Sequence, residues 1–446
     1  MKLDWKKTFL IGFGFFGISV MWQLYDSFVP IFLQSGRPDF VSSRNVLGFG
    51  LTATLTGAIM GIDNLVAIFI LPLIGMWSDH VRTRIGRRYP FIITAAPVGA
   101  LAFVLMPIAS GLINPEANGS VADNMPAFIL FMTGAGLMLL AMAVLRTPVI
   151  TLMPDLTPSP LRSKANGVIN LMGGVGVVIS SFIIARLFDL NPVLPFVTGS
   201  AVLLIAIVLL FVSVKEPDVE SLPHSEEHEA SEEEEALRAL KGLRVVPREH
   251  RRSLGFLLLA IFAWFIGYNG VSTFFTSYAV NVLHVSEGLA PTLFGIAGVT
   301  FILFAIPAGF IGERFGRRRT ISVGLAIFGV LLVVGYFTTN PTVIGAVLGV
   351  GGLAWALVNI NSLPMVVDTT NDARLLGTYT GLYYLASQTA STAAPAITGA
   401  FVDLTGGNFR VIFLSGPLFF LLAILCMQFV TRGEAHAVES VPVTAD

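Results

Sequence analysis

The sequence predicts an all-α integral membrane protein with twelve transmembrane helices arranged as two bundles of six. Three observations lead to this fold class: a composition poor in charge, long apolar segments at regular intervals, and a loop motif that occurs twice. Of the 446 residues, 54% are hydrophobic and only 12% are charged, about half the charged share of an average soluble domain. A chain of this composition requires lipid around most of its surface.

The apolar segments have the length that crosses a membrane as helix, which is roughly 20 residues for about 30 Å of hydrocarbon. The first segment is longer than the roughly 7–15 apolar residues of a signal peptide, so we expect it to be retained. The predicted helices cover 8–34, 47–77, 89–110, 126–153, 165–188, 194–214, 254–282, 288–312, 319–338, 341–367, 375–401 and 409–431.

Basic residues predict the orientation, because Lys and Arg of short loops stay on the cytoplasmic side. Only Arg37, Arg44 and Arg410 fall in loops on the opposite, external side. Both termini are therefore expected in the cytoplasm, with the chain crossing the cell membrane many times. The single cysteine, Cys426, leaves no disulfide framework and no site of several thiolates. We expect neither a metal nor another cofactor.

One long polar stretch, 215–252, separates the two sets of six helices. It carries a run of glutamates and then turns basic, and we expect a solvated tether rather than a regulatory docking segment. The predicted organisation is an N-terminal bundle over 1–214, the cytoplasmic linker over 215–252, a C-terminal bundle over 253–431 and a cytoplasmic tail over 432–446.

The two predicted bundles repeat each other. After the second helix, 75–79 (GMWSD) is followed by GRR at 86–88, and after the eighth, 309–313 (GFIGE) is followed by GRR at 316–318. A parallel repeat of a six-helix unit is typical of one large group of transporters, whereas an enzyme or a receptor has no need of it.

Two segments carry a more specific resemblance. The loop 78–92 and the segment 146–166 resemble the sucrose- and disaccharide-transporter branch of the glycoside–pentoside–hexuronide:cation symporters, within the major facilitator superfamily. One departure is His80, where such loops usually have Arg. The resemblance implies the major facilitator fold and import of a sugar, a disaccharide or another glucoside, by proton symport with alternating access.

The loop motifs also predict a gate on the cytoplasmic face. Asp79 and Glu313 are placed at the C-terminal ends of their helices, where a bare carboxylate opposes the helix dipole by roughly 0.3–1 kcal/mol. Each therefore calls for an arginine partner, and pairs made in one state and broken in the other would latch the inner faces together. The alternative is that the arginines only fix topology. The predicted gate comprises Asp79, Arg82, Arg87, Arg88, Asp155, Arg162, Glu313, Arg314, Arg317, Asp368 and Arg374.

Polar residues inside the apolar segments predict the substrate cavity. A charge at mid-bilayer costs at least about 2.5–3.5 kcal/mol, and Arg146 lies about 14 Å from the cytoplasmic end of its helix, near the level where carriers of this type bind solute. Amides, phenols and one guanidinium suit a neutral, hydroxyl-rich solute, although such amides also join helices in membranes. The predicted lining is Gln23, Tyr25, Asp26, Arg146, Tyr268, Asn269, Asn359, Asn361 and Gln388. Near the outer end of 165–188, Arg186 and Asp189 are expected to form an interfacial ion pair.

Ion coupling follows from a comparison with the melibiose carrier of the same symporter group. The positions of its sodium ligands are occupied here by Ala67, Leu71 and Gln388, which implies that no sodium site remains. We therefore expect the proton as the coupling ion, carried by Asp26 or Asp63 with a pKa raised between helices. A static buried ion pair with Arg146 is the alternative.

Other functions find less support in the sequence. A membrane enzyme is disfavoured because no zinc, serine-elbow or phosphate-loop motif occurs. A carrier-like sensor, or an exporter or facilitator of another neutral metabolite or drug, remains an alternative. The expected partners are a sugar, a proton and the lipid bilayer, without nucleic acid, and the expected functional unit is a monomer.

Overall fold

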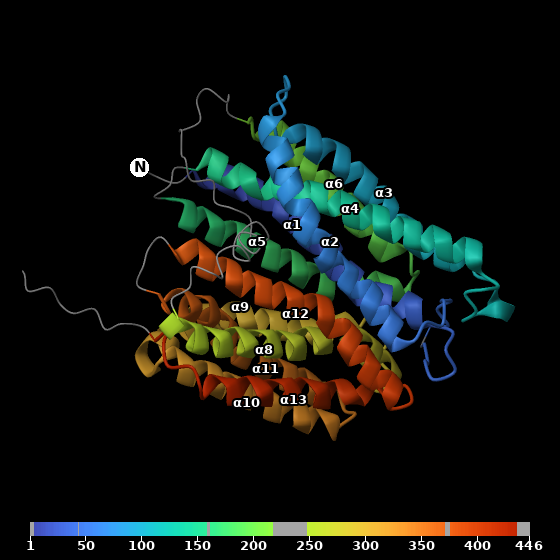
Figure 1. The fold of residues 1–446 in the computed structure, drawn as a ribbon. Coiled ribbons are helices and arrows are strands. Elements are labelled where there is room, and N and C mark those ends of the chain that lie inside the picture. Colours follow the sequence, from blue (N-terminus) through green and yellow to red (C-terminus); the bar gives the residue numbers. More distant parts are fainter. Residues whose placement is uncertain (1–3, 43, 158–160, 217–247, 371–374, 435–446) are drawn as a thin grey trace, which may run out of the picture.

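The computed structural model describes residues 4–42, 44–157, 161–216, 248–370 and 375–434. Twelve helices of at least 16 residues lie in these ranges, six in each half (Figure 1). The N half comprises α1 Trp5–Gln34, α2 Ala53–His80, α3 Tyr89–Gly111, α4 Met125–Leu156, α5 Arg162–Phe182 and α6 Leu194–Ser213. The C half comprises α8 Arg248–Asn281, α9 Ala290–Phe315, α10 Arg317–Tyr336, α11 Pro341–Val367, α12 Leu376–Leu404 and α13 Ile412–Met427. Short 3-10 helices cover Pro115–Ala117 (η1), Ile184–Asp189 (η3) and Phe409–Val411 (η6).

The predicted fold class is confirmed. In the described ranges, ten helices are long and apolar enough to cross a membrane, and α2 and α12 match them with 28 and 29 residues. Side-chain oxygens cap the N-termini of several helices. Asp4 accepts a hydrogen bond from the Lys7 amide (3.1 Å), and Thr52 accepts one from the Leu55 amide (3.2 Å). These bonds satisfy amides that have no partner inside the helix.

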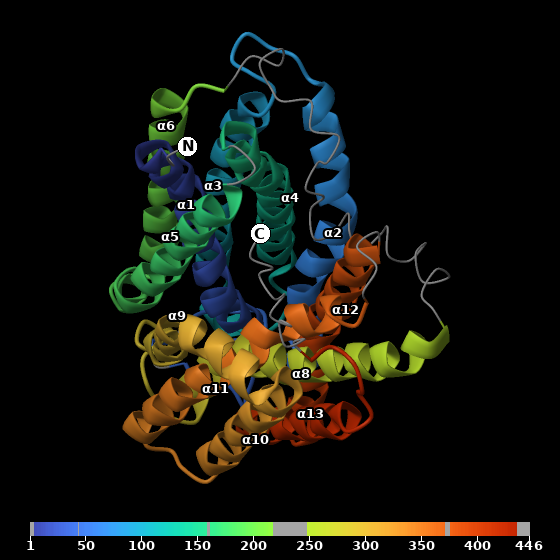
Figure 2. The same cartoon turned by 90° about the vertical axis from the view of Figure 1, so that its left-hand side faces the viewer.

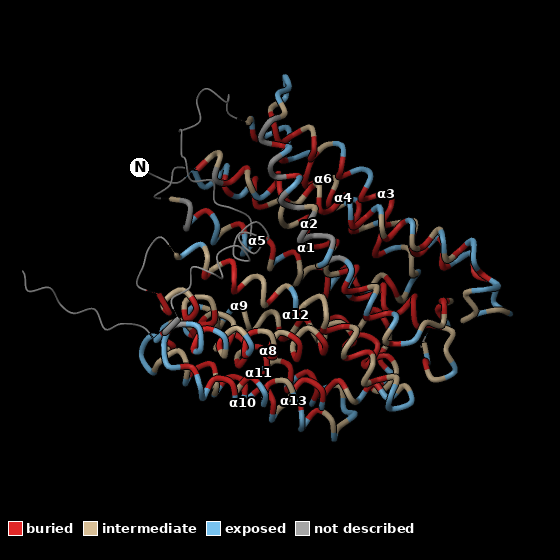
Figure 3. Tube along the Cα trace, viewed as in Figure 1, coloured by how far each residue is buried: buried red, intermediate tan, exposed pale blue. Residues whose placement is uncertain are grey.

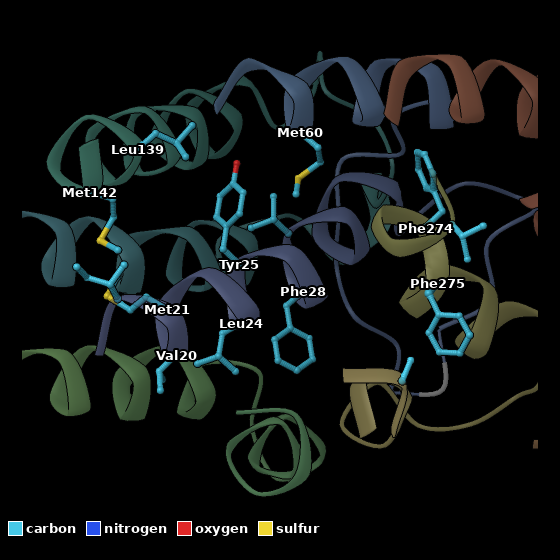
Figure 4. Close-up of a cluster of buried hydrophobic side chains, with 14 of the residues drawn as sticks. Val20, Met21, Leu24, Tyr25, Phe28, Met60, Leu139, Met142, Phe274 and Phe275 are labelled. Carbon is cyan, nitrogen blue, oxygen red and sulfur yellow. The ribbon is translucent and has the colours of Figure 1, made fainter. Parts of the chain in front are cut away.

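Helix α1 is the central element of the N half. It packs on α5 and α6, and glycines permit the approach: a Cβ at Gly176 would lie 2.7 Å from the Phe16 carbonyl oxygen. Val20, Leu24 and Phe28 line one side of α1, while the ring of Tyr25 points the other way, between α4 and α2 (Figure 4). Buried positions gather where the helices of each half face one another, as Figure 3 shows for most of the described residues. In the C half, α8 has the corresponding place and packs on α12 and α13.

The two halves meet at their external ends. Figure 2 shows α2 of the N half beside α12, and α5 beside α9, and both pairs are in contact. Gly57 and Gly61 of α2 lie so close to the carbonyls of Pro395 and Thr392 that neither position has room for a Cβ. On the other side of the molecule, a Cβ at Gly295 of α9 would lie 2.9 Å from Ser181 Cβ.

Hydrogen bonds show the same one-sided closure. Ser277 Oγ of α8 donates to Gln34 Oε1 of α1 (2.7 Å) at their external ends. Further hydrogen bonds between described residues of the two halves gather at this external end. The structure is thus closed toward the outside, and its halves separate toward the cytoplasm.

Candidate substrate cavity and cytoplasmic ion pairs

Helix α1 presents one accessible face although most of its residues are buried. Ser19, Trp22 and Gln23 are partly exposed, and Asp26 is exposed. Their spacing of three or four residues places them on one side of the helix. Because α5 and α6 cover much of α1 and α8 touches it from the other half, this face is directed into the space between the halves.

Asp26 and Asn269 lie at one level in that space. Each is eight residues inward from the cross-half pair Gln34 and Ser277, which is about 12 Å along a helix. Asn269 Nδ2 donates to Ser391 Oγ on α12 (2.9 Å). A carboxylate in the N half therefore has an amide as its counterpart in the C half, at a matching depth.

The closed end of the space lies just outside this level. The residue after Ser391, Thr392, is the point where Gly61 packs against α12. Asp63 follows two residues later on α2, but its side chain lies outside the described residues. Asp26 and Asn269 thus lie near the depth at which Gly61 of α2 packs against Thr392 of α12.

Aromatic rings from three helices form one wall of the C half. Tyr268 of α8 stacks on Trp355 of α11 with ring centroids 4.1 Å apart and planes 4° apart. Phe265 meets Trp355 edge-on at 5.7 Å and Tyr383 of α12 at 6.4 Å. We call Phe265, Tyr268, Trp355 and Tyr383 the aromatic wall. Of these, only Tyr268 was predicted, because an aromatic residue within an apolar helix gives the same sequence signal in a core as in a cavity.

Most of the predicted lining residues remain accessible. Asn359 follows Trp355 by one helical turn and shares its side of α11. Arg146 on α4 and Gln388 on α12 are half-buried. The predicted residues with at least partial exposure are Gln23, Asp26, Arg146, Tyr268, Asn269, Asn359 and Gln388.

Two predicted lining residues are placed in helix contacts instead. Tyr25 is fully buried in the core of the N half. Asn361 is 3% exposed, and its amide donates to the carbonyls of Ala308 on α9 (3.0 Å) and Leu357 (2.9 Å). Asn361 therefore joins α11 to α9, which is the alternative role that amides have in membrane bundles.

The cytoplasmic end of the N half holds a compact ion-pair cluster. Asp155 at the end of α4 accepts from Arg87 Nη2 (2.7 Å) and Arg88 Nε (3.2 Å). Arg88 also bonds to the Ser78 hydroxyl. Glu216, just after α6, accepts from the Arg88 amide (2.9 Å) at the start of α3, where a negative charge is favourable. The cluster thereby joins the ends of α2, α3, α4 and α6.

The C half repeats this arrangement. Arg317 at the start of α10 pairs with Asp368 at the end of α11. Glu434, after α13, accepts from the amides of Arg317 (2.7 Å) and Arg318 (3.2 Å). Neither Glu216 nor Glu434 was predicted from the sequence, although each follows the sixth helix of its repeat and a basic residue comes shortly before it.

Other members of the predicted gate lie outside these ion pairs. Glu313 and Arg314 are exposed, and Arg82 lines a cytoplasmic cavity of about 430 Å³ next to Arg87 and Glu216 of the N-half cluster. The side chains of Asp79 and Arg162, and all of Arg374, lie outside the described residues. Since the two clusters each stay within one half here, a latch between the halves on the cytoplasmic side stays a prediction.

Removing Asp155 is expected to destabilise the N half strongly. Asp155→Ala leaves Arg87 and Arg88, 10% and 2% exposed, without their shared carboxylate, and breaking such a buried pair costs about 3 kcal/mol. Glu313→Ala is the matched control, because this exposed carboxylate forms no ion pair with a described residue. Thermal unfolding of the purified variants checks this: the melting temperature should fall for Asp155→Ala alone. Equal melting temperatures for both variants would contradict it.

Two six-helix halves that close at one end around polar residues at mid-membrane define a solute carrier. The chain matches the family model of the Major Facilitator Superfamily over residues 8–304 and 281–444. It therefore belongs to this superfamily of transporters.

Solved structures share the fold over nearly the whole chain. A mutant of the nucleoside transporter NupG superposes with a TM-score of 0.70 over 95% of this chain and 100% of that chain, at 13% sequence identity. A D-xylose-proton symporter gives a TM-score of 0.60 over 96% and 98% of the two chains, at 16% identity. At such identities the likeness concerns the fold alone.

Curated relatives match shorter stretches. A general alpha-glucoside permease of Schizosaccharomyces pombe is 29% identical over 30% of this chain and 24% of its own length. The human proton-associated sugar transporter A is 30% identical over 22% and 11%. The drug efflux pump JefA of Mycobacterium tuberculosis is 27% identical over 35% and 30%. Each match thus spans less than a third of the relative's length.

Proposed function

We propose that this transporter imports a sugar, such as a disaccharide or another glucoside, together with a proton across the cell membrane by alternating access. One observation carries the proposal. Between the halves, an accessible carboxylate, Asp26, lies at the depth of the amide Asn269, and Tyr268, the neighbour of Asn269, stacks on Trp355.

The lining has the chemistry that a sugar requires. Amides and a guanidinium, such as those of Asn359 and Arg146, donate hydrogen bonds to hydroxyl oxygens. The partly exposed ring of Tyr268, which stacks on the buried Trp355, offers apolar surface to the C–H face of a pyranose. The names of two partial relatives, an alpha-glucoside permease and a proton-associated sugar transporter, support the same substrate class.

Asp26 is our first choice as the proton carrier. It is exposed on the face of α1 that lines the space between the halves, so both water and solute reach it. The neutral residues Ala67 and Leu71 occupy positions where the resemblance places sodium ligands. A proton that binds Asp26 when the carrier faces outward and leaves when it faces inward links the pH gradient to sugar accumulation.

Uptake into proteoliposomes tests the proposed function. With an inward-directed proton gradient and a panel of labelled disaccharides, at least one sugar should accumulate above its external concentration. A protonophore should abolish that accumulation, and a sodium gradient should not replace the proton gradient. Absence of uptake for every sugar, or uptake driven by sodium alone, would contradict the proposal.

An exporter of apolar compounds is the second candidate. The aromatic wall also suits a flat apolar solute, and one partial relative is a drug efflux pump. The two functions differ in the direction in which a proton gradient drives the solute. Proton-driven extrusion of a dye or drug from the proteoliposomes, without sugar uptake, would favour the exporter.

Trp355→Ala should weaken sugar binding about tenfold, and because Trp355 is only 5% exposed, it should also lower the melting temperature by removing buried apolar contacts. It removes the ring on which Tyr268 stacks, and a tenfold loss corresponds to about 1.4 kcal/mol. Phe420→Ala is the control, because Phe420 is 1% exposed in the same half and does not belong to the aromatic wall. Equilibrium binding of the transported sugar measures the effect. Equal affinities for the two variants would show that the aromatic wall is only core.

A further inference from the structure

Asp403, at the end of α12, crosses to the other half and caps its second helix. Its Oδ1 accepts from the Ala53 amide (3.0 Å), and its Oδ2 accepts from the amide (2.8 Å) and hydroxyl (2.6 Å) of Thr54. These are the first residues of α2, where free amides and the helix dipole favour a negative charge. Arg37 Nη1 of the N half also donates to Asp403 (3.2 Å).

Asp189 of the N half makes the corresponding contact with the C half. It lies at the end of η3, which follows α5, the repeat equivalent of α12. Its carboxylate accepts from Ser286 Oγ (2.7 Å) and from the Gly288 amide (3.1 Å), two to four residues before α9 begins. Arg44 Nε lies 3.9 Å from it. In both cases, an aspartate at or shortly after the end of the fifth helix of one half is held at or shortly before the start of the second helix of the other.

The two contacts are well placed to control opening. They are charge-assisted and only partly exposed, with 23% of the Asp403 and 20% of the Asp189 side chain accessible, so solvent screens them incompletely. Alternating access, on which this inference rests, requires the external ends of the halves to part. That movement separates each carboxylate from its hydrogen-bond donors in the opposite half.

We propose that Asp403 and Asp189 are the paired external gate residues of the transport cycle. Each carboxylate holds the second helix of the opposite half, and together they favour the state that is closed to the outside. The arginine of each pair comes from the α1–α2 loop. This one loop therefore supplies an arginine to both contacts. Neutral variants should therefore shift the population toward the outward-open state.

Thiol accessibility tests the proposal without any sugar. In a Cys426→Ser background, Thr56→Cys places a thiol at a fully buried position of α2, close to the contact of Gly57 with α12. Labelling from outside with a membrane-impermeant reagent should become about tenfold faster in the Asp189→Asn/Asp403→Asn double variant. Each single variant should give a smaller increase. Asp123→Asn is the matched control, because this external aspartate bonds to Ser120 within its own loop.

A second thiol position separates gating from loosened folding. Ser200→Cys lies in the core of the N half, where the Ser200 hydroxyl donates to the Ala100 carbonyl (2.9 Å), and its labelling should stay unchanged. Unchanged labelling at Thr56→Cys in the double variant, or equal increases at both positions, would overturn the proposal. Because no solute is present, a faster reaction at Thr56→Cys alone supports the gate even if sugar uptake fails its own test.

Discussion

Asp26→Asn is expected to abolish sugar accumulation while leaving sugar exchange intact. The substitution keeps the size and hydrogen bonding of the side chain but removes its titration. Asn269 already occupies the corresponding depth in the C half, which indicates that an amide is tolerated there. With a pH gradient imposed, the accumulation ratio should fall at least about tenfold, to equilibration. Exchange of labelled for unlabelled sugar at equal concentrations should continue.

Two comparisons make this result specific. Glu116→Gln, in the exposed 3-10 helix η1, removes a carboxylate on the external side and should leave accumulation unchanged. Asp63→Asn shows whether the second carboxylate shares the role. Normal accumulation in an Asp26→Asn/Asp63→Asn double variant would refute proton coupling through either residue. Loss of exchange together with accumulation would place Asp26 in sugar binding instead.

Arg146→Ala is expected to abolish sugar binding even when no gradient is present. Its guanidinium is half-buried on α4, about 14 Å from the ion-pair cluster at Asp155, and bonds from a charged donor are about twice as strong as neutral ones. Loss of more than tenfold in affinity corresponds to more than about 1.4 kcal/mol. Equilibrium binding to the purified carrier measures it.

Matched variants test whether the loss of sugar binding in Arg146→Ala has only a structural cause. Arg146→Lys keeps the charge but loses the planar fork of donors, so its affinity should be intermediate. Arg186→Ala removes an arginine that is exposed in η3 and should bind normally. Affinity of Arg146→Ala within about threefold of the wild type would make Arg146 a structural residue and exclude the proposed lining.

Hydrophobic length was sufficient to predict the helices but not all of their ends. The second helix was predicted from residue 47, yet α2 begins at Ala53. The preceding segment is apolar because it packs in extended form along the end of α1, where the Leu51 amide donates to the Leu33 carbonyl (2.8 Å). Conversely, α8 begins at Arg248, in a stretch predicted as linker, since a helix that extends beyond the membrane can be charged. Hydropathy indicates that a segment is buried, but it does not determine the backbone conformation of that segment.

Adjacent residues in the sequence can have different surroundings, which limited prediction of the site. Tyr25 and Asp26 differ by about 100° around α1, so one ring is buried in the core while the neighbouring carboxylate is exposed. Asn359 and Asn361 differ in the same way: the first is half-buried and the second joins two helices. Without the packing of the neighbouring helices, sequence spacing cannot separate the two roles.

The contacts between the halves could not be predicted from the sequence alone. Asp189 was predicted to pair with the nearby Arg186, but its bonds go to Ser286 and Gly288 of the other half. The same holds for Asp403 and its partners at the start of α2. Such partners are roughly 100 and 350 residues apart, and only the packing of one repeat against the other brings them together.

Simultaneous recording of proton and sugar movement tests the central claim most directly. In proteoliposomes without a pH gradient, an inward sugar gradient should drive protons inward, and the external medium should become alkaline in step with sugar uptake. Reciprocity requires this, because a coupled carrier is driven by either gradient. Protons and sugar should enter together in the wild type, and no alkalinisation should occur in Asp26→Asn. Sugar uptake at a normal rate with no proton movement would contradict it.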